Sequence, residues 1–136
     1  MTIRSVVLCC GLVVGRGMAQ EMPAPPSQPF QAVHLYHIDV PGPEAEKKMI
    51  DAYAEINKAI AKAGCKKCVY HLWKAHEQPE KGINYIQVSW WPGREIYEKV
   101  HKDAGFLAAG KKAEPAFGSM VKEQTYNRYV EIVPGK

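Results

Sequence analysis

Apolar residues in the first half of the domain follow first a strand pattern and then a helix pattern. Residues 33–40 (VHLYHIDV) are rich in β-branched and aromatic side chains and end at a Pro-Gly-Pro turn, which predicts a first strand. From residue 44 to residue 63 the apolar positions lie three and four apart, which is typical of an amphipathic helix. Gly64 follows as a stop signal.

The second half continues with two strands, a helical region and a last strand. Residues 68–76 (CVYHLWKAH) and 83–91 (INYIQVSWW) flank a polar segment that contains breaker residues, which predicts a hairpin. Short helices are expected over 94–101 and 104–117, with Pro115 placed to kink the second. Residues 125–133 (TYNRYVEIV) predict the closing strand.

The resulting order, β-α-β-β-α-β, predicts an α+β protein with a ferredoxin-like antiparallel sheet. Right-handed crossovers give the strand order 4-1-3-2 and place the helices on one face. Strand residues on both faces are large and apolar or aromatic: Leu35/Tyr36 and Leu72/Trp73 are neighbours that point to opposite faces, and Val88 and Trp90 add two more such residues on one face. A bare second face would be an unusually large apolar patch, so we expect two copies to pair sheet to sheet as a dimeric α/β barrel.

The N-terminal 31 residues are not expected to belong to the folded domain. Residues 1–19 have a basic start, an apolar stretch from 6 to 14 and small residues at Gly17 and Ala19, the order of a cleaved signal peptide. An uncleaved N-terminal anchor is the alternative. Residues 20–31 are proline-rich and predict an extended or disordered linker, and residues 32–136 form the domain. The prediction is a periplasmic or secreted protein with no membrane attachment after cleavage near Ala19.

Charge adds little to this picture. The chain has 18 basic and 14 acidic residues. Arg4 and Arg16 fall within the predicted signal peptide, so the mature net charge is about +2, which does not favour nucleic acid as a partner.

Four segments carry a resemblance to a known family: 35–42 (LYHIDVPG), 55–64 (EINKAIAKAG), 70–74 (YHLWK) and 90–106 (WWPGREIYEKVHKDAGF). On these residues the chain resembles the dimeric α/β-barrel superfamily, and within it the antibiotic-biosynthesis-monooxygenase (ABM) type of domain. The resemblance implies a homodimer whose ligand cavity lies between sheet and helices, lined by an asparagine, a tryptophan and a histidine.

Two functions follow from this resemblance. One is a cofactor-independent monooxygenase that acts on a small aromatic or quinol compound. The alternative is a non-catalytic dimer that binds a small hydrophobic ligand or haem. Fold membership alone does not decide between them.

The candidate catalytic residue is His101, with Tyr97 beside it as a ligand-binding residue. They are four residues apart, so they share one face of the predicted helix, where the imidazole could accept a proton or bind haem iron. The alternative is a histidine that only caps the helix C-terminus as a cation.

Asn57, Trp73 and Trp90 are the other candidate ligand-binding residues. The tryptophans could stack on a planar ligand, or they could be packing and interface residues. Asn57 lies at the margin of the first helix's apolar side and could reach the cavity or only solvent. In the family the asparagine lies near the first strand instead.

Cys65 and Cys68 are the cysteines left after export, and an oxidising compartment favours a local disulfide between helix and strand. Exchange with a redox partner is the weaker alternative, because a Cys-x-x-Cys at a helix C-terminus lacks the dipole that lowers a thiol pKa. No metal site is expected: two cysteines are too few for zinc, and His34 and His37 should face opposite sides of their strand.

Overall fold

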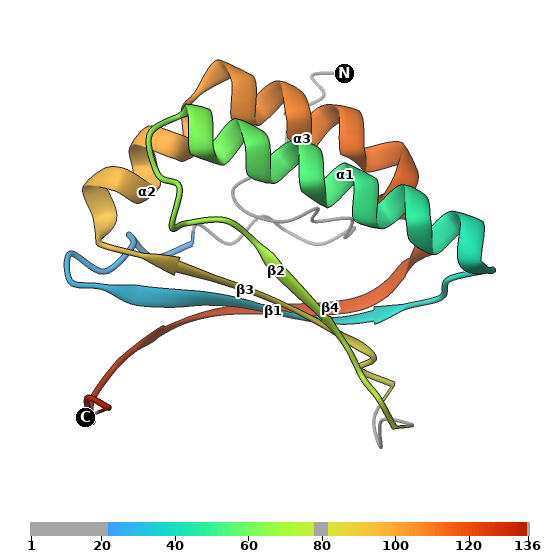
Figure 1. Ribbon diagram of the computed structural model, residues 1–136. Helices are drawn as coiled ribbons and strands as arrows, with labels where there is room; N and C mark the ends of the chain where they lie inside the picture. The colour runs from blue at the N-terminus through green and yellow to red at the C-terminus, as the bar shows by residue number, and fades with distance from the viewer. Residues whose placement is uncertain (1–21, 78–81, 136) are drawn as a thin grey trace, which may run out of the picture.

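The computed structural model describes residues 22–77 and 82–135. Within these residues a four-stranded antiparallel sheet carries helices on one face and none on the other (Figure 1). The elements are β1 (Phe30–Ile38), α1 (Pro43–Lys62), β2 (His71–Lys74), β3 (Tyr85–Trp91), α2 (Arg94–His101), α3 (Ala104–Phe117), the 3-10 turn η1 (Gly118–Met120) and β4 (Val121–Val130). The predicted ferredoxin-like arrangement is confirmed.

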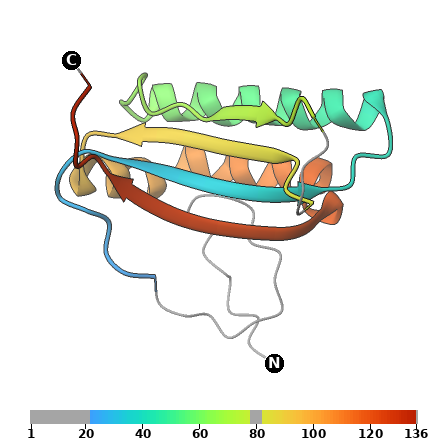
Figure 2. The same cartoon turned by 90° about the horizontal axis from the view of Figure 1, so that it is seen from below.

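The strands lie in the order β2-β3-β1-β4, which is the predicted order read from the other edge (Figure 2). The first strand of the chain is therefore central, and it pairs with β3 on one side and with β4 on the other. The edge strands are β2 and β4.

Helix α1 follows the predicted pattern closely. It begins with proline and has acidic Glu44 and Glu46 in its first turn, where they complement the positive end of the helix dipole. Its buried side is made by the predicted apolar residues Met49, Tyr53, Ile56 and Ile60. Gly64 follows the helix with φ 111°, a left-handed conformation that favours glycine.

All four strands start at other residues than the sequence predicts, and β3 starts two residues later, at Tyr85. β2 is shorter, because the residues from Cys65 to Tyr70 form a connection tied to α1 rather than part of the ladder. β4 begins earlier, at Val121, directly after η1. β1 also begins earlier, at Phe30, so two residues of the predicted linker belong to the sheet.

Successive residues of a strand point to opposite faces of the sheet, and this alternation decides which residues face the helices. On β1 and β3 every second residue is buried beneath the helices. These residues are Phe30, Ala32, His34, Tyr36 and Ile38 on β1 and Tyr85, Gln87, Ser89 and Trp91 on β3. Together with α1, α2 and α3 they enclose an interior that contains several polar side chains.

The opposite side of the sheet, here called the outer face, carries no helix (Figure 1). Its large apolar residues are Val33, Leu35, Trp73, Ile86, Val88, Trp90 and Tyr129. Trp73 is 62 % and Tyr129 is 52 % exposed. A hollow of about 280 Å³ lies at one end of this face, lined in part by Trp90 and Tyr129.

The predicted signal peptide lies outside the described residues. Residues 22–29 have no helix or strand, and their proline carbonyls contact the domain: Arg94 Nε donates to the Pro25 carbonyl at 2.7 Å and Arg128 Nη1 to the Pro23 carbonyl at 2.6 Å. No helix in the described part of the chain is both long and apolar enough to span a bilayer.

Candidate functional site

The short helix α2 and the turn that follows it position His101. Tyr97 lies one helical turn earlier, and its ring is stacked on the imidazole with ring centroids 3.9 Å apart. Asp103 caps α3 by accepting a hydrogen bond from the Phe106 backbone, which sets the ring of Phe106 4.9 Å from that of His101. Trp91 from β3 adds a third ring, at 5.0 Å. His101 is only 6 % exposed inside this aromatic wall.

Hydrogen bonding fixes the protonation of His101. Its Nδ1 lies 2.6 Å from the Tyr97 carbonyl oxygen, and a carbonyl can only accept, so Nδ1 carries the proton. Its Nε2 is then a buried acceptor with no hydrogen-bond partner among the described residues. The site thus holds a basic nitrogen whose lone pair is unused.

The same surroundings make His101 a neutral group. Burial lowers its pKa from 6.5 to about 4; the positive charge of Arg128 acts in the same direction, and the bond to the Tyr97 carbonyl opposes it. The ring therefore bonds a carbonyl of the last helical turn without carrying charge at neutral pH. The contact with a carbonyl of the last turn that a helix cap requires is thus present, and burial disfavours the cationic form that was expected for it.

A second polar group lies beside the first. The Tyr97 and Tyr126 hydroxyl oxygens are 3.2 Å apart. Arg128 donates from Nε to the Tyr126 hydroxyl at 2.9 Å and from Nη2 to the Tyr97 hydroxyl at 3.4 Å. Its guanidinium carbon lies 5.1 Å from the Tyr97 ring centroid and 5.4 Å from that of Tyr126. Tyr97 thus connects the imidazole to the guanidinium.

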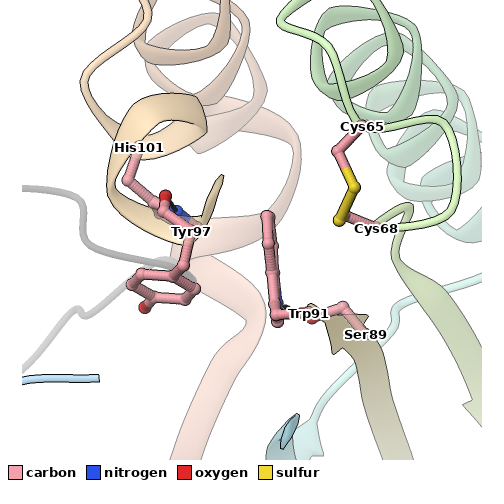
Figure 3. The surroundings of a disulfide bond; sticks show 6 residues. All are labelled: Cys65, Cys68, Ser89, Trp91, Tyr97 and His101. Carbon is pink, nitrogen blue, oxygen red and sulfur yellow. Dashed lines mark hydrogen bonds between the residues drawn. A yellow bond between two sulfur atoms is a disulfide. The ribbon is translucent and has the colours of Figure 1, made fainter. Parts of the chain in front are cut away.

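Trp91 is the tryptophan of this interior. It is fully buried, and its indole donates to the Ser89 hydroxyl at 2.8 Å. In Figure 3 the indole stands between Tyr97 on one side and the disulfide of Cys65 and Cys68 on the other. Its ring meets that of Tyr97 edge to face at 5.0 Å.

The structure corrects the predicted positions of Trp73 and Trp90. Both lie on the outer face, 62 % and 40 % exposed, and neither lines the interior next to His101. Because adjacent strand residues point to opposite sides, choosing Trp90 instead of Trp91 selected the wrong face. The alternative to ligand stacking was that these tryptophans are packing or interface residues, and their position on the outer face is compatible with an interface role.

Asn57 lies next to the interior, and its amide group is occupied by the backbone. Its Nδ2 donates to the Tyr70 carbonyl at 2.9 Å, and its Oδ1 accepts from the Tyr70 amide at 2.6 Å. This pair of bonds imitates a strand partner for the segment that precedes β2. The geometry gives Asn57 a structural task in place of the expected ligand contact or solvation.

Cys65 and Cys68 are joined by a disulfide between the end of α1 and the connection to β2. The Cys68 amide also donates to the Cys65 carbonyl, so the two residues close a tight turn. The described residues contain no group of three side chains suited to hold a metal ion. His34 is buried on the inner face, whereas the half-buried His37 lies on the outer face beside Asp39.

Comparisons with known proteins agree with this fold. No protein-family model matches the sequence, and no curated protein is significantly similar to it. Among solved structures, the chain is similar to a dimeric ferredoxin-like protein of unknown function from Thermobifida fusca (TM-score 0.57, 9 % identity, 77 % of this chain and 92 % of that one).

It is also similar to a ferredoxin-like protein of the DABB family from Mesorhizobium loti (TM-score 0.57, 9 % identity, 77 % of this chain and 98 % of that one). A third similar structure is a variant of SnoaB, a cofactor-independent oxygenase from Streptomyces nogalater (TM-score 0.54, 13 % identity, 79 % of this chain and 96 % of that one). The protein therefore shares the ferredoxin-like fold of these structures. The expected resemblance is confirmed at the level of the fold.

Several residues of the site were not identified from the sequence: Trp91, Tyr126 and Arg128. The sequence held no clear signal for Trp91, because Gln87 and Ser89 lie on the same side of the strand, and alternating polar residues usually mark a solvent-facing side. It held none for Arg128 either, whose surroundings come from α2, from β4 and from a residue more than one hundred positions earlier.

Proposed function

We propose that the protein is a cofactor-independent oxygenase of the ABM type that acts on a small aromatic or quinol compound. The observation that supports this most strongly is the unpartnered Nε2 of His101 within a wall of aromatic rings. A planar substrate that displaces part of this wall would find an acceptor for its hydroxyl proton. The described interior is closely packed around His101, so ring movement must accompany binding.

The low pKa of His101 does not prevent this role. The ring is neutral at pH 7 and can accept a proton. Its imidazolium form is disfavoured by burial, but an oxyanion formed on the substrate next to it would stabilise the cation. The electron-rich substrate would then react with dioxygen, one oxygen atom entering the product and the other leaving as water, with all four electrons supplied by the substrate.

Oxygen uptake tests this proposal. The purified protein should consume dioxygen with at least one member of a panel of small quinols and phenolic aromatics, and His101→Ala should lose the activity. His76→Ala is the matched control, because that histidine is exposed in the segment that follows β2, outside the interior beneath the helices. Uptake that is absent, or equal in His101→Ala, would count against the oxygenase.

A second function, a dimer that binds a small hydrophobic ligand without catalysis, is favoured by the strongly lowered pKa of His101 and by its complete aromatic enclosure. Haem would have to displace more of these rings than a small aromatic compound does. The Nε2 atom is a suitable ligand atom, but it is buried among rings, and a porphyrin placed on it would overlap them. A haem titration followed by absorbance should therefore give no Soret band that depends on His101.

Homodimerisation is part of the proposed function. The outer face exposes several large apolar side chains on one side of the sheet, more than a monomer usually leaves in water. The similar protein from Thermobifida fusca is described as dimeric. A sheet-to-sheet pair would cover this face and leave the helices outside.

We also propose that the protein is exported to the periplasm or secreted. The support is the N-terminal pattern of a basic start, an apolar stretch and small residues before position 20, together with a disulfide, which persists in oxidising compartments. N-terminal sequencing of protein recovered outside the cytoplasm should begin at Gln20. Recovery only as an uncleaved cytoplasmic protein would contradict export.

A further inference from the structure

Arg128 has an unusual charge environment. It is half-buried on β4, and no carboxylate of the described chain lies within ion-pair distance of its guanidinium. Its side-chain hydrogen bonds go to two tyrosine hydroxyls and to the Pro23 carbonyl, all of which are neutral. Removing a guanidinium from water costs free energy that neutral partners repay only in part. The position is therefore electrostatically prepared for an anion.

The geometry of the guanidinium favours a carboxylate. Its two terminal nitrogens point toward different partners, Nη1 toward the Pro23 carbonyl at 2.6 Å and Nη2 toward the Tyr97 hydroxyl at the long distance of 3.4 Å. These two nitrogens can bind both oxygens of one carboxylate. The Pro23 carbonyl oxygen would then occupy the place of one ligand oxygen.

The segment 22–29, here called the strap, is held at two further points near this position. Arg94 donates to the Pro25 carbonyl at 2.7 Å, and Pro25 is buried. The strap also passes so close to Gly93 that a Cβ there would lie 2.4 Å from the Ser27 carbonyl oxygen. It has no helix or strand of its own, so few backbone bonds need to break for it to move.

We infer that Arg128 is the anchor for the carboxylate of a planar aromatic acid, and that the strap competes with this ligand by placing the Pro23 carbonyl on the same guanidinium. The aromatic part of the ligand would lie toward Tyr97, whose ring contacts both Arg128 and His101. The inference rests on the ligand-binding part of the proposed function and adds the class of ligand and its regulation by the strap.

Calorimetric titration of the full chain with 2-naphthoate and with its neutral isostere 2-naphthamide tests this inference. Hydrogen bonds to a charged partner give roughly tenfold to hundredfold in affinity, so the wild type should prefer the carboxylate by that factor. Arg128→Gln should bind both compounds equally, and Arg128→Lys, which keeps the charge but not the planar fork, should retain part of the preference.

The matched variant is Arg94→Gln, which loosens the strap but leaves Arg128 intact. It should bind 2-naphthoate several times more tightly than the wild type does, with the preference over the amide retained. Arg128→Gln and Arg94→Gln are thus expected to act in opposite directions. A thermal unfolding curve for each variant verifies that it is folded. If Arg128→Gln does not fold, Arg128→Lys takes its place in the comparison.

Equal binding of acid and amide by the wild type, no binding of either, or a preference that survives in Arg128→Gln would overturn the anchor. Unchanged affinity in Arg94→Gln would overturn the competition by the strap. Neither probe is a quinol, so the result does not depend on oxygen uptake. A carboxylate preference without any oxygen uptake would refute the oxygenase alone, and uptake without that preference would refute this inference alone.

Discussion

At the scale of single residues, burial changes the chemistry of two polar side chains in different ways. His101 loses its charge because the aromatic wall excludes water, and it keeps an unused acceptor atom. Asn57 uses its whole amide group on the backbone of Tyr70 and has little left for a ligand. One of the two predicted polar residues is therefore available for chemistry, and the other maintains the framework.

His101 should make folding stability depend on pH. Its folded pKa of about 4 lies below its ordinary value of 6.5, so the unfolded chain takes up the proton more readily. The stability that belongs to the neutral ring is complete above about pH 6.5 and is lost as the pH falls toward 4, a difference of about 3 kcal/mol. Urea unfolding at a series of pH values should detect this loss. His101→Gln should show a smaller slope in that window, and an identical slope would contradict the assigned pKa.

Asn57→Ala should destabilise the fold by about 1–3 kcal/mol, because it leaves the Tyr70 amide and carbonyl without their partners. Lys58→Ala is the control, since this exposed neighbour makes only a surface ion pair with Glu55 and should change stability by less than about 0.5 kcal/mol. Chemical denaturation of the two variants compares them directly. An Asn57→Ala variant as stable as Lys58→Ala would show that the backbone of Tyr70 does not need this support.

At the scale of elements, local signals predicted the helices better than the strands. Helices α2 and α3 have the predicted boundaries, because Pro92-Gly93 and Asp103 mark their beginnings. The length of β2 was overestimated, because its first residues have strand-like composition but are tied to α1 by Asn57, a contact that no local pattern reveals.

The candidate site was predictable only where its residues share one element. Tyr97 and His101 lie one turn apart on α2, and their spacing alone indicated a shared face. Arg128 and Trp91 reach the same place from two different strands, so tertiary pairing was needed to bring them together. Trp90 and Trp91 were distinguishable only by strand parity, which the sequence left open.

The disulfide between Cys65 and Cys68 should stabilise the connection from α1 to β2. Closing so short a loop contributes about 2 kcal/mol in the chain-entropy description. Reduction should therefore lower the free energy of unfolding of the wild type by about that amount and leave the Cys65→Ala/Cys68→Ala variant unchanged. Thermal unfolding with and without a reducing agent makes the comparison. If the stability of the wild type does not change on reduction, the disulfide does not stabilise this connection.

At the scale of the whole molecule, the uneven coverage of the sheet is the dominant feature. Helices cover one face (Figure 1). Large apolar side chains occupy the other. A second copy would bury this outer face and complete a barrel around two sheets. The helices stay outside such a pairing.

Charge placed on the outer face should separate the proposed dimer. Trp90→Glu puts a carboxylate where an aromatic side chain is 40 % exposed beside the hollow, and we expect the dimer dissociation constant to rise roughly thirtyfold or more. Ile50→Glu is the control, because Ile50 is a similarly exposed apolar residue on α1, on the helical side of the sheet. Concentration-dependent light scattering should show weakening for the first variant only.

Sedimentation velocity of the wild-type chain in dilute buffer tests the central claim, the pairing of two outer faces, most directly. If two outer faces pair, the chain sediments as a single folded species with twice its own mass at micromolar concentration. A well-folded monomer that persists as the concentration is raised would contradict the pairing and the barrel built on it.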